Sequence, residues 1–208
     1  MSGAEAIATG ANVDWLGFGL AILVIELTPG PNMAWLAGLS LTEGRRAGLA
    51  ATLGIALGLA INASVAALGL TALIALDHPL QHLLRLAGAA MMATLAWLAW
   101  RGGDAKVPTR LANRKNFGAG LMLNLLNPKA FLLFVMVAPP FLSGAPLATR
   151  QALAMAGISV GIATLVHLLL VALAASAHQF AADPARTRLV RRIMAGLMLG
   201  MAAWFLIE

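Results

Sequence analysis

Apolar residues run along this chain in six long stretches, separated by short segments that are polar or charged. A helix that crosses a membrane needs about 20 mostly apolar residues, and more if it is tilted. We therefore predict six transmembrane helices. They cover residues 15–41, 48–74, 80–100, 118–142, 151–178 and 189–207. The segments between them each hold a charge, a proline or a glycine, which are the residues expected where such a helix ends.

Proline interrupts the first and the fourth of these predicted helices. Pro29, Gly30 and Pro31 lie in the middle of the first, and Pro128 lies in the fourth. Proline lacks a backbone N–H and clashes with the preceding turn, so a helix cannot run unbroken through these positions. Two broken hydrophobic spans in matching places are typical of the substrate site of a transporter.

The two halves of the chain resemble each other in pattern. Three predicted spans lie on each side of the basic segment 101–116, so the halves would have opposite orientations. Each half has a pair of glycines four residues apart in its second span: Gly54 with Gly58, and Gly157 with Gly161. We predict a single all-α transmembrane domain over residues 1–208, built from inverted three-helix repeats of about 15–100 and 118–207. The segment 101–116 would be the loop that joins them.

Composition agrees with a membrane protein. Apolar residues make up 61% of the chain and charged residues 11%, and the mean hydropathy is +0.87, whereas a soluble domain has about 45–50% apolar and 25% charged residues. The net charge of +6 lies in short loops without an aromatic basic groove, so we expect no nucleic-acid partner. The absence of cysteine excludes disulfides, thiolate metal sites and a catalytic thiol. Residues 1–14 lack the basic start of a signal peptide, so the first span should be retained.

The basic residues also predict an orientation. Of the fourteen Lys and Arg residues, eleven would lie on one side of the membrane. They are Arg45, Arg46, Arg101, Lys106, Arg110, Arg114, Lys115, Arg186, Arg188, Arg191 and Arg192. Cytoplasmic loops carry an excess of Lys and Arg, so this side is predicted to be cytoplasmic and both termini to be periplasmic.

A few polar residues fall at mid-membrane depth, where an ionisable side chain is costly and faces a protein interior or a water-filled path. Glu26 and Lys129 each lie close to a proline break, and they would either pair across the two halves or act on a substrate. The remaining candidates are Asn62, Asn124, Asn127 and His167. Each asparagine alone is more simply explained by hydrogen bonding between helices, and His167 either relays protons or is a packing residue.

The breaks also predict a class of ligand. The helix that follows Pro31 begins at mid-membrane with free N–H groups and a positive dipole end, which favours an anion such as a carboxylate. The helix after Pro128, with Lys129 in its first turn, would be a second such end, and Glu26 would accept an ammonium group. We therefore predict a small zwitterion as the ligand, with no metal or other cofactor. The stretch Gly157-Ile-Ser-Val-Gly161 matches the elbow of serine hydrolases, but that elbow needs a strand–turn–helix context. We predict no catalytic residue and no enzyme.

Two signatures resemble those of a known family. Thr28-Pro-Gly-Pro-Asn32, followed by Gly44-Arg-Arg-Ala-Gly48, is similar to the opening of the lysine-exporter superfamily (LysE/RhtB type), and Asn124-Leu-Leu-Asn-Pro-Lys-Ala-Phe131 resembles its second signature. The resemblance implies proton-driven export of amino acids across the bacterial inner membrane. It also implies that residues of both signatures line or shape the translocation site: Pro29, Gly30, Pro31, Asn32, Asn127, Pro128 and Lys129. A histidine common near the end of the family's second span is Asn62 here.

The sequence thus predicts a secondary transporter in which Glu26 binds a proton and a substrate ammonium group in competition. Its partners would be an amino acid, protons and membrane lipid, and its oligomeric state is open, a homo-oligomer included. The alternative is a lipid-handling or structural polytopic membrane protein with broken helices.

Overall fold

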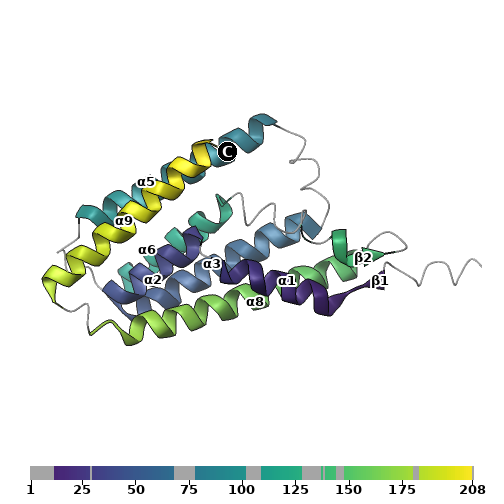
Figure 1. The fold of residues 1–208 in the computed structure, drawn as a ribbon, viewed down its shortest axis with the longest axis horizontal. Helices are drawn as coiled ribbons and strands as arrows, with labels where there is room; N and C mark the ends of the chain where they lie inside the picture. Colours follow the sequence, from purple (N-terminus) through teal and green to yellow (C-terminus); the bar gives the residue numbers. More distant parts are fainter. Residues whose placement is uncertain are drawn as a thin grey trace, which may run out of the picture.

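The computed structural model describes residues 12–28, 30–67, 78–101, 109–127, 137, 139–143, 148–179 and 183–207. This part of the chain is almost entirely helical, as predicted (Figure 1). Its α-helices are α1 (Trp15–Leu27), α2 (Pro31–Glu43), α3 (Arg45–Ala67), α5 (His78–Arg101), α6 (Thr109–Leu125), α8 (Thr149–Ser176) and α9 (Pro184–Ile207). Two strands of two residues each, β1 (Asn12–Val13) and β2 (Leu142–Ser143), pair antiparallel beside a short 3-10 helix, η1 (Pro139–Phe141).

The first predicted span is two helices at an angle. Helix α1 ends at Leu27, where Thr28 donates its backbone N–H to the carbonyl of Ile25. Helix α2 begins at Pro31, and its axis is bent by 56° from that of α1. Proline suits the first position of a helix because the N–H that it lacks would have no helical partner there. Pro29 lies outside the described residues.

Helices α2 and α3 are joined through a single residue. Gly44 adopts φ +84°, a conformation that side chains with a Cβ rarely take, and its N–H bonds to the carbonyl of Ser40 at 3.0 Å. Helix α3 then starts at once with Arg45. The chain therefore reverses direction without a loop.

Several predicted boundaries are wrong by a few residues. Helix α6 begins at Thr109, so the second half of the predicted basic loop 101–116 is helical, and α9 begins at Pro184 instead of residue 189. A change in hydropathy marks where lipid contact would end, but a helix can continue beyond it into polar sequence. At α9, Asp183 supplies the cap, because its carboxylate accepts the N–H of Ala185 at 2.8 Å.

Helix α3 packs against α2, α6 and α8, while α5 and α9 lie side by side along one edge (Figure 1). Buried side chains of α2, α3, α5 and α9 form one apolar cluster, which includes Leu36, Ile55, Met92 and Met198. A second cluster joins α1 to α8 through Phe18, Ile22 and Met155. These clusters hold α1, α2, α3 and α8 around the bend.

The two predicted glycine pairs have different surroundings. A Cβ on Gly54 would clash with the backbone carbonyl of Phe117 in α6, so the backbones of α3 and α6 touch here. Gly157 and Gly161 are exposed on α8, and no described atom lies within 4 Å of a Cβ placed on either. Among the described residues, only Gly54 and Gly58 lie at a close contact between two helices.

The outer surface is apolar on most helices. Exposed leucines include Leu16, Leu20, Leu57, Leu165 and Leu173. Among the described residues, α3 and α8 are each long and apolar enough to cross a membrane, and α1 with α2 would form a third, bent span. The prediction of six spans stays a prediction, because only two or three candidate spans are found and the predicted span 118–142 includes residues outside the described set.

Candidate functional site

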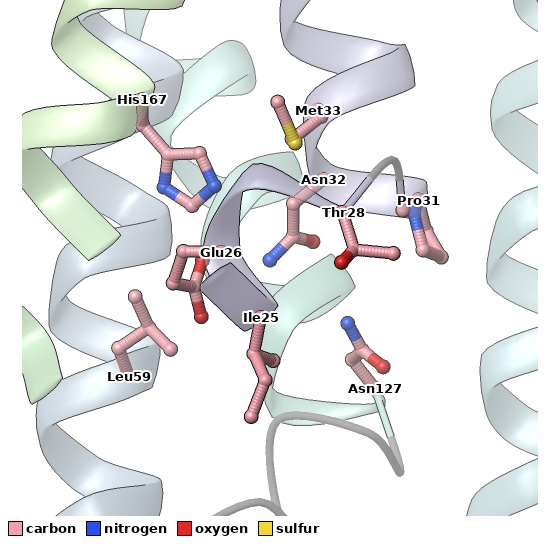
Figure 2. A pocket seen from close by; sticks show the side chains of 10 residues that line it. Ile25, Glu26, Thr28, Pro31, Asn32, Met33, Leu59, Asn127 and His167 are labelled. Carbon is pink, nitrogen blue, oxygen red and sulfur yellow. The ribbon is translucent and has the colours of Figure 1, made fainter. Parts of the chain in front are cut away.

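A cavity of about 40 Å³ lies at the bend between α1 and α2 (Figure 2). Its walls come from α1, α2, α3, α8 and the segment that follows α6. The lining residues are Ile25, Glu26, Thr28, Gly30, Pro31, Asn32, Met33, Leu59, Asn127 and His167. Six predicted site residues are among them: Glu26, Gly30, Pro31, Asn32, Asn127 and His167.

The other five predicted site residues divide into two groups. Asn62 and Asn124 lie behind the cavity. Asn124 is hydrogen-bonded to Asn32, which lines the cavity, and Asn62 is hydrogen-bonded to Asn124. Pro29, Pro128 and Lys129 lie outside the described residues, and with them the predicted pairing of Glu26 with Lys129.

Three buried asparagines connect the two signature segments. Asn32, in the first turn of α2, donates its Nδ2 to Oδ1 of Asn124 at 2.9 Å. Asn62 of α3 donates its Nδ2 to the backbone carbonyl of Asn124 at 3.1 Å. The same carbonyl accepts the N–H of Asn127 at 3.1 Å, so both of its lone pairs are used at the end of α6. Hydrogen bonds between helices thus satisfy the Nδ2 of Asn62 and the Oδ1 of Asn124, which is the explanation that the sequence suggested for these asparagines.

Some polar atoms near the cavity have no hydrogen-bond partner among the described residues. The ring of His167 is only 2% exposed, and its Nδ1 has no hydrogen-bond partner among the described residues. The same is true of Oδ1 of Asn32 and Nδ2 of Asn124. Buried polar atoms are nearly always satisfied in folded proteins, so such atoms call for water or a ligand.

The charges around the cavity are arranged asymmetrically. Glu26, which is half-buried in the last turn of α1, is the one carboxylate in the described lining, and no Lys or Arg is present there. The first turn of α2 begins at Pro31 on the same cavity, and no side chain caps it. Figure 2 shows the Glu26 and His167 side chains directed into the space beside this turn. An acidic group and a positive helix end therefore share one small cavity.

Sequence reasoning missed the apolar part of the lining. Leu59 and Met33 carry no signal by themselves, because most residues of their helices are apolar. Leu59 lies one turn before Asn62 on α3, so the polar residue marks the correct face of that helix. Thr28 belongs to the first signature and borders the cavity, with its hydroxyl donated to the carbonyl of Val24 at 3.1 Å.

The serine of the hydrolase-like motif is not part of a nucleophile elbow. Ser159 lies inside the long helix α8, and its hydroxyl donates to the carbonyl of Met155 one turn earlier at 2.9 Å. The motif therefore has neither the turn nor the exposed hydroxyl that the elbow requires.

A helical protein with an apolar exterior, whose polar groups gather at a buried bend, has the features of a membrane translocator. The family comparison agrees. The profile of the LysE type translocator family matches residues 23–208, and the chain belongs to this family. The resemblance drawn from the two signatures is thereby confirmed.

Similar proteins are membrane proteins of bacteria. An uncharacterised membrane protein of Vibrio cholerae is 25% identical over 190 residues, which are 89% of this chain and 93% of the relative. The membrane protein YahN of Escherichia coli is 29% identical over 150 residues, 69% of this chain and 67% of its own. A homoserine/homoserine lactone efflux protein of Salmonella typhimurium is 26% identical over 132 residues, 62% of this chain and 64% of its own. No solved structure matches.

Proposed function

We propose that this translocator exports amino acids or closely related small zwitterions across the bacterial inner membrane, in exchange for protons. The observation that carries the proposal is the cavity at the bend, where Glu26 and the first turn of α2 lie on the same small space. A relative that is named for the efflux of homoserine and its lactone supports a substrate of this size and chemistry.

The charges suggest how the substrate binds. Its carboxylate would lie at the start of α2, where the first N–H groups of a helix have no helical partner and the dipole is positive. Its ammonium group would lie beside Glu26. The Oδ1 of Asn32, which has no partner among the described residues, would accept a hydrogen bond from the substrate, so that binding satisfies a buried acceptor.

Proton exchange would follow from competition at Glu26. A proton and a substrate ammonium group cannot both occupy the same carboxylate, so the binding of one releases the other. Coupling further requires that the two access states bind each ligand with different affinity, since equal affinities would shift nothing. A cavity of about 40 Å³ holds a few water molecules at most. Substrate entry would therefore move α1 relative to α2, about the bend between them.

The packing of the described helices supports the inverted repeat. In the predicted arrangement, α3 and α8 are equivalent, as are α5 and α9. Helix α3 packs on α6, which begins the fourth predicted span, and α8 packs on α1 and α2, which form the first. These two contacts are equivalent under the repeat. The contacts α3–α8 and α5–α9 each join two equivalent helices. Contacts also place the basic ends of several helices near each other: Glu43 accepts a hydrogen bond from Asn116, and Arg192 lies over Trp100. We propose that this end is cytoplasmic and that both termini are periplasmic.

Transport in liposomes tests the function. Purified protein is reconstituted, a proton gradient is imposed, and the uptake of labelled homoserine and a panel of amino acids is measured. Two assays are run on each variant: uptake driven by the gradient, and exchange of labelled for unlabelled substrate without a gradient. We expect wild type to do both, and Glu26→Gln to lose gradient-driven uptake.

Glu43→Gln is the matched control, because Glu43 lies at the exposed end of α2, away from the cavity. It should transport like wild type. If Glu26→Gln keeps gradient-driven uptake, the proton site is elsewhere, and His167 is the next candidate. If wild type moves no substrate of the panel in either assay while remaining folded, the amino-acid proposal is wrong.

A further inference from the structure

Two arginines lie on two tryptophans where the end of α5 meets the start of α9. The guanidinium of Arg101 is 4.5 Å from the centre of the Trp97 ring, within α5. The guanidinium of Arg192, on α9, is 5.5 Å from the centre of the Trp100 ring, on α5. Both distances lie within the range of cation–π contacts. We call these four residues the arginine–tryptophan cluster.

Neither arginine of this cluster is in an ion pair that the described residues show. The ion pair found among them joins Arg186 to Asp183. A guanidinium stacked on a ring through its face keeps its in-plane N–H donors for other partners. The planar donor fork of arginine matches the oxygens of a phosphate group.

The surroundings of the cluster are apolar as well as basic. Both tryptophans are more than half exposed, at 55% and 57%. Beside them, Leu98 on α5 and Leu189 and Ile193 on α9 are exposed too. A site for a free phosphate, a nucleic acid or an acidic peptide has no use for this apolar border. A phospholipid does, because its acyl chains lie along the helices while its phosphate reaches the arginines.

We propose that the arginine–tryptophan cluster binds the headgroup of an anionic phospholipid. Arg101 and Arg192 donate to the phosphate, Trp97 and Trp100 hold the two guanidinium groups in place at the membrane interface, and the neighbouring apolar side chains contact the acyl chains. The lipid thereby bridges α5 and α9 at the end that we propose to be cytoplasmic, outside the substrate cavity. This inference does not depend on what the protein transports.

Native mass spectrometry of the full chain in detergent tests the proposal. The protein is titrated with phosphatidylglycerol and phosphatidylcholine of identical acyl chains, and the two binding constants are compared. We expect wild type to prefer phosphatidylglycerol. Arg101→Gln with Arg192→Gln should lower its affinity about 30-fold, since each basic residue near an anionic headgroup contributes a factor of about five. Phosphatidylcholine binding should change little.

Arg114→Gln with Lys115→Gln is the matched control, since it removes the same charge from exposed positions of α6, outside the cation–π contacts found among the described residues. It should keep the preference. A second variant, Arg101→Lys with Arg192→Lys, keeps the charge but loses the fork and should lose part of the preference. Circular dichroism in the same detergent checks that each variant is folded.

Three results would overturn the proposal. The first is a wild type that shows no preference for phosphatidylglycerol. The second is an equal loss of preference in the Arg101/Arg192 and the Arg114/Lys115 glutamine variants, because the lipid would then be attracted by the overall positive charge. Displacement of the lipid by excess inorganic phosphate would show a phosphate site without lipid specificity.

Discussion

The contact between α3 and α6 makes a sharp prediction about Gly54. A Cβ added at Gly54 would lie 2.8 Å from the backbone N of Leu121 and 2.9 Å from the carbonyl carbon of Phe117, and closer still to the Phe117 oxygen. Contacts of this kind become ordinary at 3.4 Å. All three atoms belong to the backbone and cannot rotate away. The two helices must therefore separate by at least about 0.6 Å, the difference between 2.8 and 3.4 Å.

This separation also reaches the buried asparagines. The hydrogen bond from Asn62 to the carbonyl of Asn124 crosses the same pair of helices, with a length of 3.1 Å. Moved apart by the same amount, the two atoms would be about 3.7 Å apart, which is beyond hydrogen-bond distance. We expect Gly54→Ala to lower the free energy of unfolding by about 2–4 kcal/mol, of which overpacking contributes about 1–3 kcal/mol and the weakened hydrogen bond about 1 kcal/mol.

Gly157→Ala is the control, because it makes the same chemical change in the other predicted repeat. No described atom would contact the new methyl group, and alanine is favoured over glycine in a helix by about 1 kcal/mol, so the variant should be as stable as wild type or slightly more so. Unfolding by SDS in mixed micelles, followed by circular dichroism, measures both. Equal stability of the two variants would refute the close contact of α3 with α6.

Further predictions use the same unfolding assay. Phe18→Ala should lower the free energy of unfolding by about 3–5 kcal/mol, because Phe18 is fully buried. Leu16→Ala, at an exposed position, should lower it far less. Equal losses in the two variants would contradict the packing of α1 on α8. Asp14→Ala should cost about 1 kcal/mol, because it removes the acceptor for the N–H of Gly17, while Asp14→Asn should keep most of the cap; identical losses would contradict the capping role. Asn124→Ala should cost about 1–3 kcal/mol by leaving the amide of Asn32 buried without its partner, and a neutral effect would contradict that bond.

The sequence predicted the centre of this site better than its walls. Glu26, Asn127 and His167 were identifiable because a polar residue in an apolar span is costly and has a reason to be there. Asn32 was identifiable only through the resemblance of its segment to a family signature. The bend was identifiable because proline cannot continue a helix. Leu59 could not be identified as a cavity residue from the sequence, because most residues of its helix are apolar. Which of them face the cavity depends on how the helices pack.

Other features depend on tertiary contacts that no local pattern encodes. The pairs Gly54/Gly58 and Gly157/Gly161 have the same spacing, yet only the first faces a neighbouring backbone among the described residues. The pairing of β1 with β2 involves two residues on each side, which is too short for a strand pattern. The start of α6 was misplaced because hydropathy reports contact with lipid, whereas a helix ends where its hydrogen bonds end.

The single-residue connection at Gly44 has a mechanical consequence. One residue reaches less than 4 Å even when fully extended, so it leaves no slack between the two helices that it joins. The ends of α2 and α3 therefore cannot move apart, and a change in the angle between the two helices requires rotation about the backbone of Gly44. Helix α1 is joined to α2 through the longer segment 28–30, in which Thr28 and Gly30 have extended backbones, and α1 packs on α8. A rearrangement at the bend that keeps the ends of α2 and α3 together would change the angle between α1 and α2, which is 56° in this structure.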